Sequence, residues 1–287
     1  MSEQASAAAQ TYAREVEEFN QRVSAHSLGD VRGYHWYHTI ELRDGLVTPG
    51  FYDHRSSLSA FQFPTDMGGM SALDIGSATG FFAFEFERRG AEVVSVDVPS
   101  LADLDRFPGQ TVDQTVRKIE AMLAAGHEPI AGGLTEQHCY LNLLEGPFQF
   151  CHGLLGSKVK RCYSTVYDLS PEKLGRGGFD LVYMGDILLH TLHPLEALAS
   201  AARLCRGTLV LSQFIPEMND DRPAMLYVGG DDPGADEISW WWPNRACLTE
   251  ILKKLGFADV AEVGTHSGVL KSTGYEYQRS ILHARRG

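Results

Sequence analysis

The sequence lacks several features that define large classes of proteins. No apolar run approaches the roughly 18 residues that a membrane-spanning helix needs. The first residues show no basic segment followed by an apolar one, as a secretion signal would. The five cysteines are widely spaced, with no CxxC pair and no neighbouring metal-ligand pattern. We therefore expect a cytoplasmic protein that keeps reduced thiols, has no membrane partner and holds no metal ion.

Basic residues are also scarce. The chain has 25 Lys and Arg against 37 Asp and Glu, which gives a formal net charge of −12, and no basic run is longer than a pair such as Arg285 and Arg286. Proteins that bind nucleic acid usually carry a basic patch, because neutralising phosphates releases counterions. The composition therefore disfavours a nucleic-acid partner. A length of 287 residues favours one catalytic domain with appended segments.

The clearest motif is SALDIGSATGFFAFEFERRGAEVVSVDVPS, residues 71–100. A short apolar run, Ala72 to Ile75, ends at Gly76, where a missing side chain lets backbone amides approach a ligand. A phenylalanine-rich helix is predicted from near Thr79. The next strand ends at Asp97, 97 − 76 = 21 positions after the first glycine, where an acid can accept hydrogen bonds from ribose hydroxyls. The motif predicts a nucleotide-binding βαβ unit.

Asp74, the acid just before the glycine turn, distinguishes between two candidate cofactors. The turn GSATG lacks the middle glycine that dinucleotide-binding folds use for close pyrophosphate approach. A carboxylate at Asp74 would repel a pyrophosphate, whereas it suits the ammonium and sulfonium groups of S-adenosylmethionine (SAM). The sequence thus favours SAM over NAD.

These residues resemble a known family, the class I SAM-dependent methyltransferases. LDIGSATG is similar to the family's glycine-rich motif and VDV to its ribose-binding acid, and residues 164–198 resemble the adenine-side strand, the fourth strand and the following helix. The resemblance implies an α/β fold: a Rossmann-like seven-stranded sheet with helices on both faces. It also implies that ADVAEVG and YQRSILHAR form an antiparallel hairpin at the sheet edge.

The resemblance implies a set of donor-binding residues. Asp74 and the turn would hold the methionine end, Asp97 the ribose, and Asp168 beside Tyr167 the adenine. A helix N-cap before Ser170 is an equally good role for Asp168. The full cofactor set is Asp74, Gly76, Ser77, Ala78, Thr79, Gly80, Asp97, Val98, Tyr167, Asp168 and Met184.

A narrower resemblance concerns two segments, MGDILLHTLHPLEAL and WWWPNRACLTEILKKLGFADV. Both are similar to the bacterial wobble-uridine tRNA methyltransferases that form 5-carboxymethoxyuridine. Those enzymes bind a carboxylated SAM through a tyrosine before the histidine and arginines after it, where this chain has Leu189, Thr191 and Leu192. The departure favours ordinary SAM and a small-molecule acceptor, such as a hydroxyl of a specialised metabolite. Two alternatives stay open: tRNA modification, with a basic groove from Arg203, Arg206, Lys253 and Lys254, and a non-catalytic SAM-binding subunit.

Two histidines follow the fourth strand and are candidate catalytic bases. Histidine titrates near neutrality, so His190 can accept a hydroxyl proton, and His193 would share its face of a helical turn. A structural role, in which the ring bonds to backbone, fits the same pattern.

The chain is predicted to divide into an N-terminal segment, 1–62, and a methyltransferase domain, 63–287, with insertions at about 101–146 and 215–243. The N-terminal segment begins with an amphipathic helix over 5–24, followed by an aromatic stretch that forms either a hairpin lid or a satellite hydrophobic cluster. Ligands of this fold bind outside the carboxyl ends of the strands, where these segments can roof one pocket as a lid. A homodimer is the default oligomer. The candidate acceptor-binding residues are Trp36, His38, Tyr52, Tyr227 and Trp241.

Overall fold

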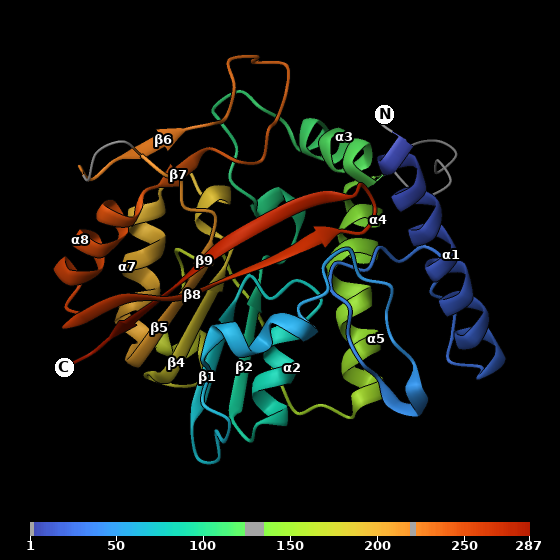
Figure 1. Ribbon diagram of the computed structural model, residues 1–287, viewed down its shortest axis with the longest axis horizontal. Helices are drawn as coiled ribbons and strands as arrows, with labels where there is room; N and C mark the ends of the chain where they lie inside the picture. The colour runs from blue at the N-terminus through green and yellow to red at the C-terminus, as the bar shows by residue number, and fades with distance from the viewer. Residues whose placement is uncertain (1–2, 124–134, 219–221) are drawn as a thin grey trace.

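The computed structural model describes residues 3–123, 135–218 and 222–287, and its centre is a seven-stranded sheet (Figure 1). The strand order is β3-β2-β1-β4-β5-β9-β8, with the first five strands parallel and β9 antiparallel to both β5 and β8. This order confirms the Rossmann-like methyltransferase sheet and its closing hairpin. The strands are β1 (Ser71–Ile75), β2 (Glu92–Asp97), β3 (Lys160–Tyr163), β4 (Phe179–Gly185), β5 (Cys205–Gln213), β8 (Asp259–Leu270) and β9 (Tyr275–Arg285).

Helices cover both faces of the sheet, and a small two-stranded sheet lies above it. The helices are α1 (Glu3–Ala25), α2 (Phe81–Arg88), α3 (Val112–Leu123), α4 (Glu136–Tyr140), α5 (Gly146–Leu155), α6 (Pro171–Leu174), α7 (Pro194–Leu204) and α8 (Arg245–Lys254). Short helical turns are η1 (Arg43–Gly45), η2 (Arg55–Phe61), η3 (Leu101–Asp103), the π-helical η4 (Leu141–Glu145) and η5 (Leu188–His190). The small sheet pairs β6 (Met225–Tyr227) with β7 (Trp241–Pro243).

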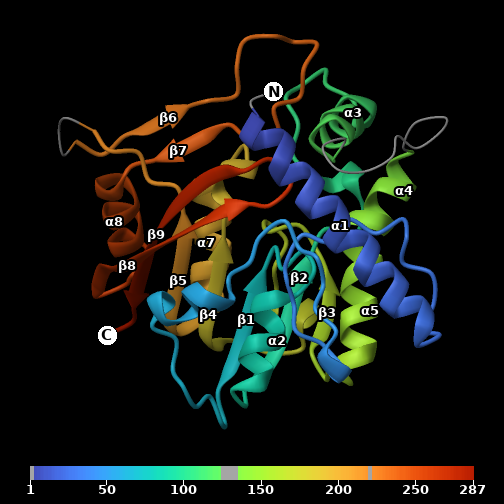
Figure 2. The same ribbon diagram turned by 45° about the vertical axis from the view of Figure 1, so that its right-hand side comes forward.

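The sheet is buried on both faces, as a parallel sheet requires. Along β4, Leu181 and Tyr183 join the core under α2 and α5, while Val182 and Met184 join the core under α7 and α8. Successive side chains of a strand point to opposite faces, so the continuous apolar run of β4 serves both cores at once. Figure 2 shows this layered arrangement from a second direction.

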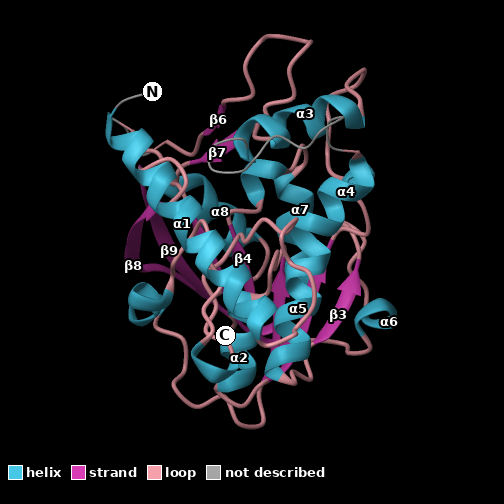
Figure 3. Cartoon of the chain, turned by 90° about the vertical axis from the view of Figure 1, so that its right-hand side faces the viewer, coloured by secondary structure: helices cyan, strands magenta, loops and turns pink. Residues whose placement is uncertain are grey.

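The N-terminal helix α1 runs beside α5 (Figure 3). The apolar stripe of this amphipathic helix, Tyr12, Val16, Phe19 and Val23, is buried. Phe19 makes edge contacts with Trp36 and with Phe150 of α5, so the helix is packed on this chain's own core. None of the helices in the described ranges is long and apolar enough to span a membrane.

Three further predictions from the sequence concern segments outside the central sheet: a crossover helix that starts at Pro147, a short hairpin in the aromatic stretch after α1, and a glycine-bearing loop at 126–133. The crossover helix α5 begins at Gly146 and has Pro147 in its first turn, as predicted; it continues α4 and η4 without a break, and the Thr135 side chain caps the start of α4. The aromatic stretch after α1 forms two isolated bridges, Glu41 with Val47 and His38 with Tyr52, and not a regular hairpin. The predicted glycine-bearing loop over 126–133 lies outside the described residues.

Candidate active site

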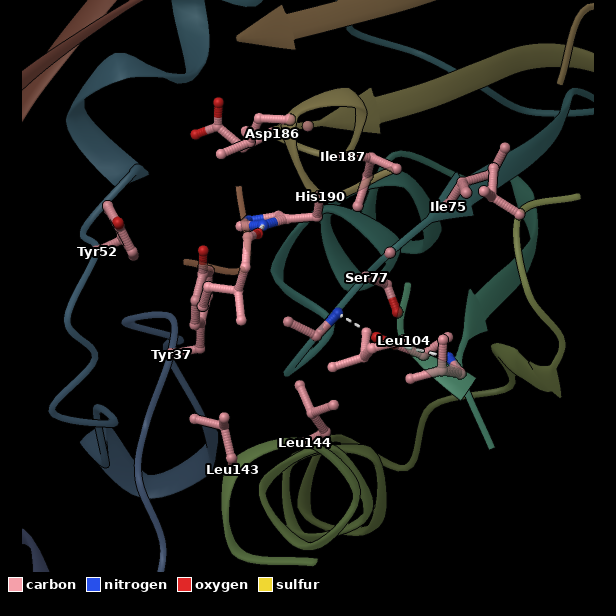
Figure 4. A pocket seen from close by; sticks show the side chains of 18 of the residues that line it. Tyr37, Tyr52, Ile75, Ser77, Leu104, Leu143, Leu144, Asp186, Ile187 and His190 are labelled. Carbon is pink, nitrogen blue, oxygen red and sulfur yellow. Dashed lines mark hydrogen bonds between the residues drawn. The ribbon is translucent and has the colours of Figure 1, made fainter. Parts of the chain in front are cut away.

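A cavity of about 440 Å³ opens at the carboxyl ends of the central parallel strands. Its walls come from the glycine turn after β1, the end of β2, the segment after β4, the hairpin β8–β9 and the N-terminal aromatic stretch (Figure 4). Both insertions contribute as well, through residues such as Leu104, Leu144, Ile238 and Trp240. The N-terminal stretch and the two insertions therefore line one pocket together, as predicted.

Every second residue of the glycine turn 76–80 has a backbone conformation in the left-handed region. Gly76, Ala78 and Gly80 have φ of 71°, 46° and 92°. A side chain at Gly76 would place its Cβ only 1.9 Å from Cδ1 of Ile187, which itself lines the cavity. Ala78 stands at the place of the missing middle glycine and adopts the same left-handed conformation, so the loop keeps its shape without that glycine.

Asp97 holds this turn from the end of β2. One carboxylate oxygen accepts the backbone N–H of Ala78 at 2.8 Å and the other accepts that of Val98 at 2.9 Å. All three residues line the cavity. The half-buried carboxylate therefore stands beside the turn, where a ribose would lie.

Asp74 is the most perturbed acid of the site. It is 1% exposed, and burial raises the pKa of its carboxyl to about 7, with Asp97 adding repulsion and Arg161 opposing the shift. Its Oδ2 has no hydrogen-bond partner among the described residues. A buried oxygen without a donor is costly, and a ligand ammonium would supply one.

Sequence reasoning missed Arg161 of β3, which lies beneath the donor site. Its Nη1 donates to the hydroxyls of Ser77 at 2.5 Å and Ser95 at 2.9 Å, and its Nη2 lies 3.5 Å from Asp97 Oδ2. The guanidinium also stacks 4.1 Å from the centroid of Phe148. This buried cation ties the glycine turn to the ribose-side acid and to α5.

The other predicted cofactor residues divide into two groups. Ser77 and Tyr167 line the cavity. Thr79, Gly80, Asp168 and Met184 do not: Met184 is in the core, Asp168 is exposed, and Thr79 accepts the N–H of His38. The helix N-cap after β3 is Ser170 and not Asp168.

His190 projects into the cavity between Asp186 and Tyr37 (Figure 4). Its Nδ1 is hydrogen-bonded to the carbonyl oxygen of Ile238. A carbonyl only accepts, so Nδ1 must carry the ring proton and Nε2 of the neutral ring is left as an acceptor. Burial lowers the pKa of His190 from its usual value, against the opposing effect of this hydrogen bond.

His193 does not share this position. It is exposed, forms the N-terminal boundary of α7, and is absent from the cavity wall. The helical turn ends at His190, and Thr191 is extended, with φ −115° and ψ 136°. The chain therefore leaves the turn before it can bring the second histidine onto the same face.

The predicted acceptor residues are also divided. His38 and Tyr52 line the cavity, whereas Trp36 is fully buried in the core, Tyr227 is exposed and Trp241 is outside the wall. The neighbouring Trp240 lines the cavity instead. Sequence reasoning missed several further wall residues that come from distant segments: Tyr37, Asp186, His266, Tyr277 and Arg279.

The part of the cavity around His190, here called the acceptor side, contains an ion pair whose two charges neutralise each other. Arg279 donates to both carboxylate oxygens of Asp186, at 2.9 and 2.7 Å, and it is the only Lys or Arg among the described wall residues. Burial lowers the pKa of His54 to about 4 and that of His266 to about 3. At neutral pH these rings are uncharged, so this side presents aromatic rings, neutral imidazoles and one closed ion pair.

Comparison with known proteins agrees with this fold. Residues 52–262 match the methyltransferase domain family. No curated protein matches the chain. Similar solved structures include magnesium protoporphyrin IX methyltransferase from Synechocystis with bound SAH (17% identity, 81% of each chain, TM-score 0.48) and the N-terminal domain of EvdMO1 with SAH bound (18%, 94% of this chain and 97% of that one, 0.49). A third is 1,6-didemethyltoxoflavin-N1-methyltransferase from Burkholderia thailandensis (16%, 76% and 72%, 0.42).

The family match covers well over half of the chain, so the chain belongs to the methyltransferase domain family. Together with the strand order, the glycine turn and the acid at the end of β2, this membership defines a SAM-dependent methyltransferase. The match is to the domain family as a whole, and the narrower resemblance to the wobble-uridine tRNA enzymes is not supported by it.

Proposed function

We propose that the chain transfers a methyl group from SAM to a hydroxyl of an uncharged small molecule, with His190 as the general base. One observation carries the proposal: His190 faces the cavity with Nδ1 held by the Ile238 carbonyl and Nε2 available as an acceptor. Among the described residues, no protein group is hydrogen-bonded to Nε2.

Bound SAM would supply the methyl group by in-line displacement at its sulfonium. For the donor, Asp74 would pair with the ammonium, the turn around Ala78 would follow the methionine end, and Asp97 would bond the ribose hydroxyls. The protein's main contribution is to hold donor and acceptor in line within one cavity. The proton of the acceptor hydroxyl would pass to His190 Nε2 as the oxygen–carbon bond forms and the carbon–sulfur bond breaks.

The surroundings of His190 suit this proton transfer. Burial keeps the pKa below its usual value, so the ring is uncharged and able to accept at neutral pH. Once protonated, the ring keeps its bond to the Ile238 carbonyl and lies near the Asp186 carboxylate, which favours the charged form. Because Asp186 is already paired with Arg279, the acceptor side offers no free charge to an ionic substrate.

The positions of the basic residues also favour a small acceptor over tRNA. Arg203 is in the last turn of α7, Arg206 is at the amino end of β5, and Lys253 and Lys254 end α8. These positions are at the edge of the sheet opposite to the cavity, which opens at the carboxyl ends of the strands. A groove made from them would not lead to His190.

Calorimetric titration with S-adenosylhomocysteine and labelled methyl transfer to a panel of hydroxylated, amino and carboxylated small molecules would test the proposal. We expect binding of the donor product and labelling of uncharged hydroxyl compounds. His190→Gln should lower turnover by about 10²- to 10⁴-fold, the usual contribution of a general base, and leave donor binding within about twofold. Unchanged turnover in His190→Gln would contradict the role of the base, and labelling of carboxylates alone would contradict the acceptor class.

A further inference from the structure

The second insertion lies directly against the turn that carries His190. The backbone N–H of Trp240 donates to the carbonyl of Leu189 at 2.8 Å, and the carbonyl of Ile238 accepts from His190 Nδ1. These two hydrogen bonds, made by the backbone of Ile238 and of Trp240, therefore place residues 238–240 of the insertion along η5. The ring orientation of His190 depends on where the Ile238 carbonyl points.

Ile238 has a backbone conformation that its side chain disfavours. Its φ is 50°, in the left-handed region, where a β-branched residue is rarely found. Such a conformation persists only when the surroundings impose it, and it is often found at functional sites. Here the backbone N–H of Ile238 donates to Asp236 Oδ1 at 2.9 Å, which closes a tight turn two residues long.

Asp236 also joins the second insertion to the first. Its Oδ2 accepts the hydroxyl proton of Thr115 on α3 at 2.6 Å, and Thr115 in turn accepts from Nε of Arg106 at 2.9 Å. Asp236 is 2% exposed and Thr115 is fully buried. Gln110 adds a bond to the carbonyl of Ala235 at 2.6 Å. The Ile238 turn is thus fixed from outside its own loop.

We infer that Asp236 is a positioning residue for the methyl transfer: by holding the Ile238 carbonyl against His190, the Thr115–Asp236 contact keeps the ring proton on Nδ1 and leaves Nε2 as the base. Histidine free in water prefers its proton on Nε2, so the insertion reverses the ordinary tautomer. Asp236 does not line the cavity, and it acts on the acceptor only through His190. This inference rests on the proposed role of His190 as the base.

The tautomer can be measured without knowing the acceptor. Nitrogen NMR of the full chain, labelled with ¹⁵N-histidine and saturated with S-adenosylhomocysteine, distinguishes the protonated ring nitrogen from the bare one, and the spectrum of His190→Gln assigns the signal. We expect the Nδ1–H form in the unmodified protein. Asp236→Ala and the nearly isosteric Thr115→Val should each shift the ratio of the two tautomers at least tenfold toward Nε2–H.

Asp231→Ala is the matched control, because Asp231 is an exposed acid in the same insertion. It should leave the tautomer unchanged. An Nδ1–H signal that persists in both Asp236→Ala and Thr115→Val would overturn the inference, as would an Nε2–H signal in the unmodified protein. Thr115→Val keeps the test decisive if Asp236→Ala fails to fold, since it removes only the two hydrogen bonds of the Thr115 hydroxyl, to Asp236 and from Arg106, with little change of volume.

The same variants separate this inference from the proposed function. If His190→Gln abolishes labelled methyl transfer while Thr115→Val alters neither tautomer nor kcat, the base stands and the positioning role of Asp236 fails. If Thr115→Val shifts the tautomer while His190→Gln transfers methyl at the ordinary rate, the contact exists and the base assignment fails. When the base role of His190 and the positioning role of Asp236 both hold, Thr115→Val should lower kcat at least tenfold. The KM for the acceptor and the donor affinity should stay within twofold of those of the unmodified protein.

Discussion

The donor half and the acceptor half of the cavity are built in different ways. Most of the donor half comes from one βαβ unit, with Asp74, the turn 76–80 and Asp97 close together in the sequence, and Arg161 is added from the neighbouring strand β3. The acceptor half joins side chains from the N-terminal stretch, the turn after β4, the second insertion and the hairpin β8–β9. The first depends on local backbone conformation and the second on long-range packing, so changes in each half should have separable effects.

The two halves also differ in charge. The donor half holds Asp74 and Asp97 against a buried Arg161, whereas the acceptor half closes its single ion pair, Asp186 with Arg279, and surrounds it with neutral rings. A ligand with an ammonium group fits the first, and an uncharged ligand fits the second. The predictions below test this division, beginning with the largest effect.

Gly76→Ala should damage the donor half most. A Cβ at this position meets Ile187 Cδ1 at 1.9 Å, and φ is 71°, so the change adds both a left-handed alanine and a steric clash. We expect a loss of about 3 kcal/mol in the free energy of unfolding. Movement of Ile187 into the cavity should also weaken binding of S-adenosylhomocysteine more than about tenfold, measured by calorimetry beside urea denaturation.

Gly69→Ala is the control for backbone strain alone. Its φ is 77°, but nothing lies within 4 Å of the added Cβ. It should cost only about 1 kcal/mol and leave donor binding intact. Equal effects of the two alanines on donor affinity would show that the close approach at Gly76 has no special role.

Arg279→Met should affect the acceptor half and spare the donor half. Removing the guanidinium leaves Asp186, which is 27% exposed, without its ion-pair partner. We expect a loss of about 2 kcal/mol in unfolding free energy, less than for a fully buried pair because solvent still reaches the carboxylate. Affinity for S-adenosylhomocysteine should change less than about twofold.

The surface pair of Arg176 and Glu92 provides the comparison, because its side chains are 36% and 78% exposed, more than those of Arg279 and Asp186. Arg176→Met should cost at most about 1 kcal/mol. A strong loss of donor binding in Arg279→Met, with Arg176→Met unaffected, would show that the two halves are not independent.

The same division explains what the sequence could predict. The glycine turn, the acid at Asp97 and the continuous apolar strands are local patterns, and the structure has them near their expected bounds. Arg161 was missed because a charge on a short edge strand gives no periodic signal. The sequence could not separate Trp241 from Trp240, because neighbouring extended residues point to opposite sides. The side is fixed by a long-range contact: Trp240, just before β7, donates its N–H to Leu189 of η5.

Asp74 provides a prediction that depends on pH. Burial raises the pKa of this carboxyl to about 7, so the charged form that pairs with an ammonium is lost as pH falls through 7. Affinity for S-adenosylhomocysteine should therefore fall about tenfold between about pH 7.5 and pH 6, with a proton released on binding. Calorimetry in buffers of different ionisation enthalpy measures both quantities.

Asp74→Asn should bind S-adenosylhomocysteine about tenfold more weakly at about pH 7.5 and without this pH dependence. 5′-Methylthioadenosine, which has no ammonium group, is the matched ligand, and its affinity for the unmodified protein should not follow the titration of Asp74. The same pH dependence for both ligands would place the carboxylate away from the methionine end.

The smallest expected effect tests the turn itself. Ala78 has φ 46°, a conformation that costs an alanine about 1 kcal/mol and a glycine almost nothing. Ala78→Gly should therefore raise the unfolding free energy by up to about 1 kcal/mol. The greater conformational entropy of glycine in the unfolded chain reduces this gain, and donor affinity should stay unchanged. Ala83→Gly, inside α2, should instead lower stability by about 1 kcal/mol. If both glycines destabilise the protein equally, the turn does not hold Ala78 in the left-handed region, and the donor half is less local than its sequence motif indicates.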